Sequence, residues 1–304
     1  MTRLPLTALV HEGPMSRAYL GLLRAQGHRL ERIVLLVQSR DAATRRPVLP
    51  WLPAALRRPV ARLLQDMRMN HWPRQFLQRQ RAAYGPWLQQ LAGAYGVSPV
   101  VFDSLTERPD HQQYADVVQE VLADGLGDPA VAAALAALPA RSTVLFTGGG
   151  MVPASLLALP NCRFIHVHPG VLPDIRGADG LLWSLLVRGR PGATAFYMAP
   201  GLDTGDIIQA SDLDLPPLPP GFADLDPATA YRLLYAVVDP LLRAVHLGRV
   251  IAWGQAAHGG DLFNLPAQAQ QADDGRTFHF MHARLRQQAL ARLLPAPAAG
   301  KGAA

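Results

Sequence analysis

Short runs of apolar residues alternate with segments of helical spacing along the first part of the chain. Residues 4–10 (LPLTALV) and 32–38 (RIVLLVQ) are apolar enough to form buried strands. Between them, residues 15–26 carry their apolar side chains on one helical face, and Gly27 follows as a C-terminal helix signal. Two strands joined by a helix of this length predict a βαβ unit in a parallel sheet.

The same alternation continues to residue 170. Apolar runs predict strands at 98–104, 142–150 and 162–170, whereas residues 111–125 have the spacing of a helix and residues 151–161 read as a turn followed by a short helix. The fold class that this pattern predicts is α/β, with an open, mostly parallel twisted sheet flanked by helices.

The remainder of the chain is organised differently. Residues 192–214 predict two strands around the turn PGLDTGD, and the proline-rich segment DLPPLPPG follows. Helices are then predicted from Pro227 onward, with a break or kink at Asp239–Pro240, and a short strand or turn precedes a last helix. We therefore expect an α/β catalytic domain over 1–215 with an arginine-rich insertion at about 40–90, a mostly helical extension over 216–294, and a disordered tail over 295–304.

Composition restricts the class of protein. No run of eighteen apolar residues and no signal-peptide layout occurs, so we expect a cytoplasmic protein without a membrane partner. The single cysteine, Cys162, excludes an intrachain disulfide. Residues 40–81 hold ten arginines and only two aspartates. We interpret this segment as a solvated helical insertion in preference to a nucleic-acid-binding segment.

Candidate chemistry gathers where two predicted strands end. His166 and His168 are two residues apart, so both side chains should lie on one face of their strand. Glycines follow this strand at Gly170 and the preceding one at 148–150. Ligands of open α/β sheets bind beyond the carboxyl ends of the strands, so these turns predict a pocket. Neither turn has a phosphate-binding fingerprint.

Two segments, HVHPGVLPDIRGADG (166–180) and GATAFYMAPGLDTGDII (192–208), extend this picture. In order, spacing and turn residues they resemble the folate-dependent formyltransferases, which include the methionyl-tRNA and glycinamide ribonucleotide enzymes, and the match covers roughly residues 143–210. His168 falls on the histidine of that family and Asp203 on its aspartate, 35 positions apart. The chain departs from the family at His166, which stands where the family has a catalytic asparagine.

The resemblance implies a Rossmann-type formyltransferase fold, 10-formyltetrahydrofolate as the formyl donor, and His168, Asp203 and His166 as catalytic residues. In the family, the asparagine amide donates a hydrogen bond to the formyl oxygen, the histidine moves protons, and the aspartate keeps that histidine charged. His166 would then supply a ring N–H in place of the amide. The resemblance also implies that Arg176 contacts substrate or only pins its loop. The wall of the pterin pocket would be formed by Gly150, Met151, Val152, Gly201 and Leu202.

The function that we predict is formyl transfer to the amine of a small acceptor molecule. Transfer RNA is not an expected partner, because only about seventy residues follow the proline-rich boundary and they read as mostly helical. We expect no bound metal, although two histidines and a carboxylate leave open a metal-dependent hydrolase built on His166, His168 and Asp203. A formyltransferase-like binding protein without activity is the other alternative. The acceptor and the oligomeric state are left open.

Overall fold

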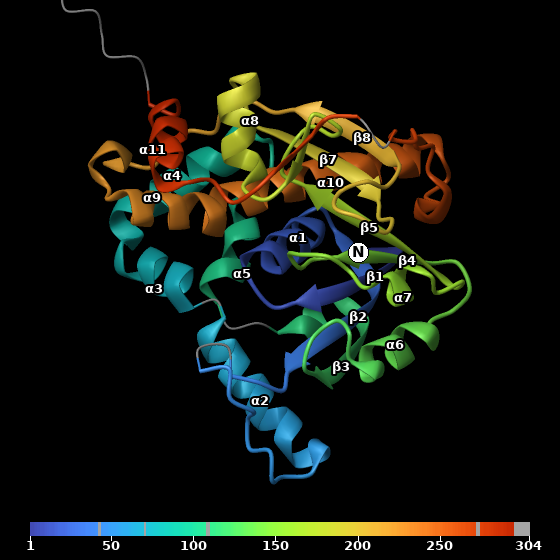
Figure 1. Ribbon diagram of the computed structural model, residues 1–304. Coiled ribbons are helices and arrows are strands. Elements are labelled where there is room, and N and C mark those ends of the chain that lie inside the picture. The colour runs from blue at the N-terminus through green and yellow to red at the C-terminus, as the bar shows by residue number, and fades with distance from the viewer. Residues whose placement is uncertain (42–43, 70, 108–109, 272–273, 295–304) are drawn as a thin grey trace, which may run out of the picture.

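A computed structural model describes residues 1–41, 44–69, 71–107, 110–271 and 274–294. A sheet of seven strands forms its centre, in the order β3-β2-β1-β4-β5-β7-β8 (Figure 1). The strands are β1 (Thr2–His11), β2 (His28–Gln38), β3 (Ala115–Ala123), β4 (Ser142–Phe146), β5 (Cys162–His168), β7 (Gly192–Tyr197) and β8 (Ile207–Asp212). The first five are mutually parallel, and β7 runs antiparallel to both of its neighbours, β5 and β8. The predicted fold class is thus confirmed.

Two of the predicted elements were wrong. Residues 98–104 form a 3-10 helix, η1 (Pro99–Phe102), and the short helix α5 (Asp103–Thr106) instead of a strand, because Ser98 caps the backbone N–H of Val100 and so starts a helical turn. Residues 111–125 form the 3-10 helix η2 (His111–Gln113) and strand β3 instead of a helix. β3 is an edge strand in which Asp116, Gln119 and Glu120 stay partly or fully exposed, and the spacing of these polar side chains resembles that of an amphipathic helix.

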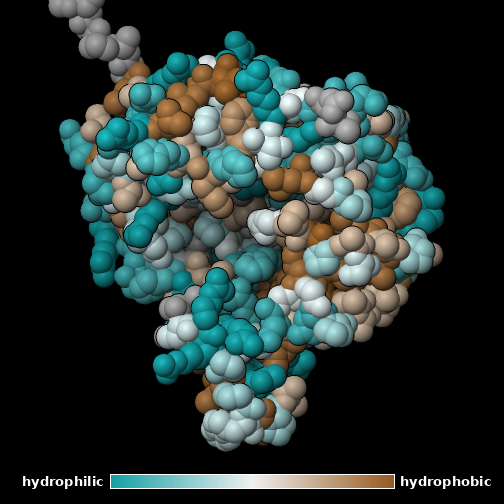
Figure 2. All heavy atoms as spheres, viewed as in Figure 1, coloured by the Kyte–Doolittle hydropathy of each residue, from teal (hydrophilic) through white to brown (hydrophobic). Residues whose placement is uncertain are grey.

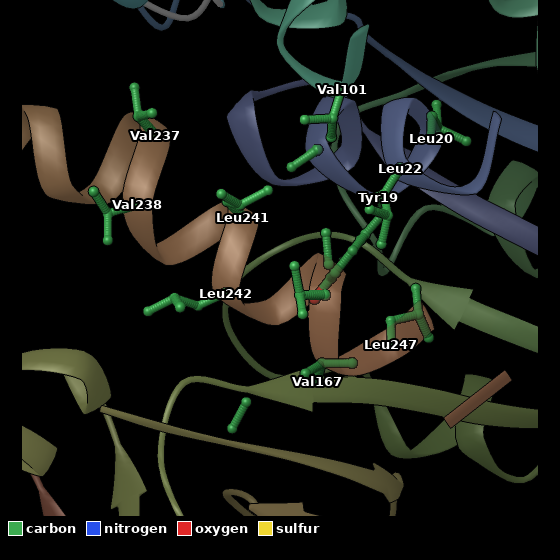
Figure 3. Close-up of a cluster of buried hydrophobic side chains, with 14 of the residues drawn as sticks. Tyr19, Leu20, Leu22, Val101, Val167, Val237, Val238, Leu241, Leu242 and Leu247 are labelled. Carbon is green, nitrogen blue, oxygen red and sulfur yellow. The ribbon is translucent and has the colours of Figure 1, made fainter. Parts of the chain in front are cut away.

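Helices cover both faces of the sheet. On one face, α1 (Pro14–Ala25) packs against α10 (Asp239–Ala257), and Figure 3 shows Tyr19 and Leu22 of α1 next to α10, with Val167 of β5 beneath. On the other face, α6 (Pro129–Ala136) and α7 (Ala154–Leu157) bury a second apolar cluster that includes Phe146. The end of β5 therefore lies between two packed layers, which hold it rigidly.

The C-terminal helices are interrupted close to the predicted break. Helix α9 (Pro227–Leu233) passes through a π-helical segment, η4 (Leu234–Val238), into α10, whose second residue is Pro240. Proline cannot donate the backbone hydrogen bond of a regular helix, and a widened turn accommodates this loss. The remaining C-terminal elements are η3 (Phe222–Asp224), η5 (Leu262–Asn264), β9 (Arg276–Phe278), paired with β6 (Ile175–Gly177), and helix α11 (Ala283–Ala291), beside α8 (Gly180–Arg188).

The arginine-rich insertion is helical: α2 (Ala54–Arg68), α3 (His71–Arg79) and α4 (Arg81–Ala94). Gln65 joins α2 to the sheet, because its amide accepts from the backbone N–H of Gln38 and donates to the carbonyl of Leu36 at 2.8 and 2.9 Å. The far end of α2 projects from the body (Figure 1). Mostly hydrophilic side chains cover this projection, with exposed apolar ones such as Leu56 and Met67 among them (Figure 2).

Two sequence predictions concern the rest of the molecule. The expected disordered tail, 295–304, lies outside the described residues. Within the described part of the chain, no helix is both long enough and apolar enough to cross a membrane.

The substitution Glu12→Gln is expected to flatten the loss of stability in acid. Burial would raise the pKa of the Glu12 carboxyl, but hydrogen bonding from His111 and the charge of Arg17 lower it from 4.5 to about 2. The stabilisation by the ionised carboxylate is therefore complete above pH 4.5 and disappears as the pH falls through about 2. A shift of this size corresponds to about 3 kcal/mol.

Urea unfolding of both proteins at a series of pH values measures this contribution. The parent should lose more unfolding free energy than the variant between about pH 5 and pH 2. Equal slopes of that free energy against pH would contradict the assignment.

Candidate functional site

The candidate site lies at the carboxyl ends of β4 and β5, where the loops after both strands begin. His166 and His168 share one face of β5, and across the antiparallel pair with β7 they stand opposite Phe196 and Thr194. Both histidines are buried, with His168 only 2% exposed. This places two imidazoles under the loops that the sequence predicted as the pocket.

His168 and Asp203 come together in the structure. The Nδ1 atom of His168 lies 3.3 Å from Oδ2 of Asp203, and the same oxygen accepts a hydrogen bond from the backbone N–H of Gly177 at 2.8 Å. Asp203 itself adopts a left-handed backbone conformation, with φ at 55°. Gly177 also has a positive φ, and a Cβ there would lie 2.1 Å from the carbonyl oxygen of Phe278, so only glycine fits.

Burial and the Asp203 carboxylate have opposite effects on the charge state of His168. Burial lowers the pKa of its imidazole below 6.5, and the nearby Asp203 carboxylate raises it only in part. The neutral ring is therefore favoured over the imidazolium at neutral pH. Its Nε2 atom is buried and has no hydrogen-bond partner among the described residues, and a Cβ on either Gly170 or Gly180 would lie 3.1 Å from it.

His166 is held in one tautomer. Its Nδ1 atom lies 3.0 Å from the carbonyl oxygen of Phe146, and because a carbonyl can only accept, this nitrogen carries the proton. Burial, followed by the charge of Arg243, lowers the pKa of the imidazole to about 4. At neutral pH the other nitrogen, Nε2, therefore holds a lone pair. This does not fit the predicted donor role of His166, because Nε2 can accept a hydrogen bond but cannot donate one.

The residues predicted to form the pocket wall lie on the two loops, and most of them reach the surface. Met151 is 69% exposed and Leu202 is 38% exposed. Gly150 and Gly201 both have positive φ. Val152 differs, because it is buried in the cluster that contains Phe146. The assignment of these residues to a cofactor pocket stays a prediction.

Arg176 is buried and bonded to the chain itself. Its guanidinium donates to Oε1 of Gln270 at 2.9 Å and to the carbonyl of Gln271 at 3.4 Å. Gln270 in turn donates to the carbonyl of Asp203 at 3.1 Å. Arg176 is therefore placed where it pins the Asp203 turn through Gln270, and a contact with substrate stays a prediction. Gln270 escaped the sequence analysis, since nothing in its local sequence marks it.

The geometry gives the metal-site alternative no support. Asp203 contacts His168 at Nδ1. Across the described ranges, no group of three or more histidine, cysteine, aspartate or glutamate side chains is arranged to hold a metal ion.

The fold is that of an open α/β sheet, a class of proteins whose ligands bind beyond the carboxyl ends of the strands, and the His168–Asp203 pair lies at such an end. Residues 99–217 match the family model described as "Formyl transferase". These residues include both histidines and Asp203, so the segment that carries the candidate site is similar to the formyl transferase family.

The curated relatives are methionyl-tRNA formyltransferases. The protein from Syntrophus aciditrophicus is 37% identical over 124 residues, which are 40% of this chain and 38% of that protein. The protein from Clostridioides difficile is 36% identical over 74 residues, or 24% of each chain. The matched segments therefore span well under half of the length of these relatives.

Two solved structures are also similar to the chain. A methionyl-tRNA formyltransferase from Clostridium thermocellum has a TM-score of 0.33 at 20% identity, covering 46% of this chain and 52% of that one. A sugar N-formyltransferase from a Shewanella species has a TM-score of 0.44 at 12% identity, covering 97% and 88%. With TM-scores this low, neither likeness bears on the function of this chain.

The prediction that tRNA is not an expected partner was wrong. Relatives that match the chain at 33–37% identity are methionyl-tRNA formyltransferases, proteins that by name act on tRNA. The prediction relied on how few residues follow the proline-rich boundary. The number of residues beyond a catalytic segment does not limit binding to a polyanion, because basic side chains anywhere on the surface can contact phosphates.

The tautomer of His166 can be measured directly. Nitrogen-15 NMR of histidine-labelled protein should show His166 neutral and protonated at Nδ1 at every pH well above about 4, because burial and the Phe146 carbonyl both favour this form. The ordinary pKa of an unperturbed histidine, about 6.5, is the reference for this measurement. Protonation of neutral His166 at Nε2, or a titration near that ordinary value, would contradict the structure.

Proposed function

We propose that this protein transfers a formyl group from 10-formyltetrahydrofolate to a primary amine. The observation that carries the proposal is the 3.3 Å contact between His168 and Asp203 inside the segment that matches the formyl transferase family. Both residues are buried at the strand ends, where an α/β sheet binds its ligands.

The loop residues are compatible with a folate donor. A pterin ring has a flat apolar body and an edge of hydrogen-bonding groups, so it needs exposed apolar side chains next to accessible backbone. Met151 and Leu202 are exposed apolar residues, each adjacent to a glycine, Gly150 or Gly201, that leaves its backbone uncovered. We assign the cofactor contacts to these residues together with Val152. When bound, the donor supplies the formyl carbon.

The histidines divide the proton chemistry. During transfer a bond forms between the acceptor nitrogen and the formyl carbon, the bond from that carbon to the donor nitrogen breaks, and the acceptor nitrogen gives up one proton. In this proposal Nε2 of His166 accepts that proton, because it holds a lone pair at neutral pH. The proton that His166 takes passes on to Nε2 of His168, whose Nδ1 Asp203 holds, and from the resulting imidazolium to the donor nitrogen as it leaves, so both histidines end neutral.

We infer that the acceptor amine belongs to an aminoacylated tRNA. The curated relatives are named methionyl-tRNA formyltransferases, and the matched segment contains the catalytic candidates. The arginine-rich residues 40–81 support this acceptor, since helix α2 projects from the body and could contact a phosphate backbone (Figure 1). Binding of tRNA should then weaken steeply as salt is added.

Formyl transfer should depend on His168 and Asp203. Incubation with 10-formyltetrahydrofolate and methionyl-tRNA, followed by mass spectrometry of the released amino acid, should show N-formylation by the parent. His168→Gln and Asp203→Asn should lower the rate by about 100-fold or more, because each removes proton transfer or its orientation. His279→Gln, at an exposed position, is the matched control and should retain the parental rate.

A nucleotide-linked amino sugar tested in parallel identifies a different acceptor. A parent protein that formylates no amine, although a folate analogue raises its melting temperature, would show that the fold binds the cofactor without transfer and would overturn the proposal.

The role of His166 is tested separately. His166→Asn replaces a lone pair at Nε2 with an amide, so transfer should fall by about 10- to 100-fold if the nitrogen accepts the acceptor's proton. Because the pKa of His166 is about 4, protonation of His166 itself should add no step to the pH profile of the parent between about pH 5 and 7. An unchanged or faster rate in His166→Asn would mean that a hydrogen-bond donor suffices, and would contradict the acceptor role.

A further inference from the structure

A buried ion pair lies on helix α10, behind the candidate site. Asp239 and Arg243 are one helical turn apart, and Nη2 of Arg243 donates to Oδ2 of Asp239 at 2.9 Å. Their side chains are only 2% and 15% exposed. Charges are costly to remove from water, and a buried pair adds little net stability compared with apolar residues of the same size. Its presence beside reactive groups therefore suggests a functional reason.

The pair is connected to the catalytic strand by a direct hydrogen bond. Nη1 of Arg243 donates to the carbonyl oxygen of Val167 at 3.0 Å. Val167 stands between His166 and His168, and Figure 3 shows it on β5 just below α10. One guanidinium thus bridges the Asp239 carboxylate on a helix and the backbone of the residue between the two histidines.

The groups around Arg243 come from several elements. Tyr19 reaches from α1 toward α10 (Figure 3), Tyr235 precedes it on η4, and Asp179 lies at the start of α8. All three interact electrostatically with Arg243, Asp239 or both. Tyr19 Oη, Asp239 Oδ1 and Nε of Arg243 are buried without a hydrogen-bond partner among the described residues. Unpaired buried polar atoms are costly, so packing alone does not account for this cluster.

Arg243 acts on the two histidines unequally. Its positive charge lowers the pKa of His166, as the second cause after burial, while Asp203 raises that pKa. The pKa of His168 is lowered first by burial and also by Arg243, but it is raised by Asp203 and by Asp239. The charges of Asp239 and Arg243 therefore oppose each other at His168, whereas Arg243 is the member of the pair that acts on His166.

We propose that Arg243, braced by Asp239, is a positioning residue that fixes the end of β5 and places a positive charge beside His166. The two functions have different chemical requirements. The electrostatic effect on His166 needs only a cation, whereas fixing the strand end needs a planar guanidinium that reaches both Val167 and Asp239 at once. The consequence for catalysis depends on the proposed formyl transfer, but the consequence for the histidines does not.

Three variants separate these requirements. Arg243→Lys keeps the positive charge but loses the planar guanidinium. The double variant Asp239→Asn with Arg243→Gln removes both charges without leaving a buried carboxylate unpaired. Arg249→Gln, at an exposed position of the same helix, is the matched control. Thermal unfolding confirms that each protein is folded before it is used.

Histidine NMR titration of each protein, without substrate, tests the electrostatic effect of Arg243 on the two histidines. In the double variant the pKa of His166 should rise, whereas that of His168 should move less, because two opposing charges leave together. Arg243→Lys should keep the parental pKa at His166, and Arg249→Gln should change neither residue. An unchanged His166 in the folded double variant would overturn the proposal.

Measurement of formyl transfer then tests whether the Arg243 guanidinium positions the end of β5. Arg243→Lys should lower kcat by about 10- to 100-fold with little change in KM, since a strand end displaced by a fraction of an ångström misaligns both rings. Parental kcat in Arg243→Lys would overturn the positioning role. A parent without formyl transfer would instead count against the proposed function, and the NMR result would still decide the effect of Arg243 on His166.

Discussion

The 3.3 Å contact between His168 and Asp203 is the constraint on which the candidate site depends. It joins the end of a central parallel strand to a turn between two antiparallel strands, and it holds only because one carboxylate oxygen serves both the imidazole and the Gly177 amide. The backbone of these turns is correspondingly specialised. Gly177 has no room for a Cβ, and Asp203 adopts a left-handed conformation that few residues with side chains tolerate.

Burial outweighs charge pairing throughout the site. Both histidines have lowered pKa values although a carboxylate lies near them, because the two packed layers over β5 exclude water from the imidazoles. The Phe146 carbonyl then decides which nitrogen of His166 carries the proton. His166 therefore does not replace an asparagine amide conservatively. The amide N–H donates a hydrogen bond, whereas Nε2 of His166 can only accept one.

Local sequence was informative where an element is regular and its surroundings are simple. The unit formed by β1, α1 and β2, the hairpin of β7 and β8, and the interruption near Pro240 all follow from apolar spacing and from proline. The segment 98–104 was misread because a serine cap and a proline start a 3-10 helix inside an apolar run. The segment 111–125 was misread because an edge strand solvates polar side chains at positions that also fit a helix.

The sequence by itself determined the fold class, the strand end that carries both histidines, and the likeness that links His168 to Asp203. It did so because hydrophobic periodicity and turn residues are local properties. Only the tertiary structure decided the charge state and tautomer of the histidines, the anchoring of Arg176 by Gln270, and the presence of Asp239 and Arg243 behind the site. Those properties depend on burial and on contacts between segments distant in the chain, such as Arg243 and Val167, which no local pattern records.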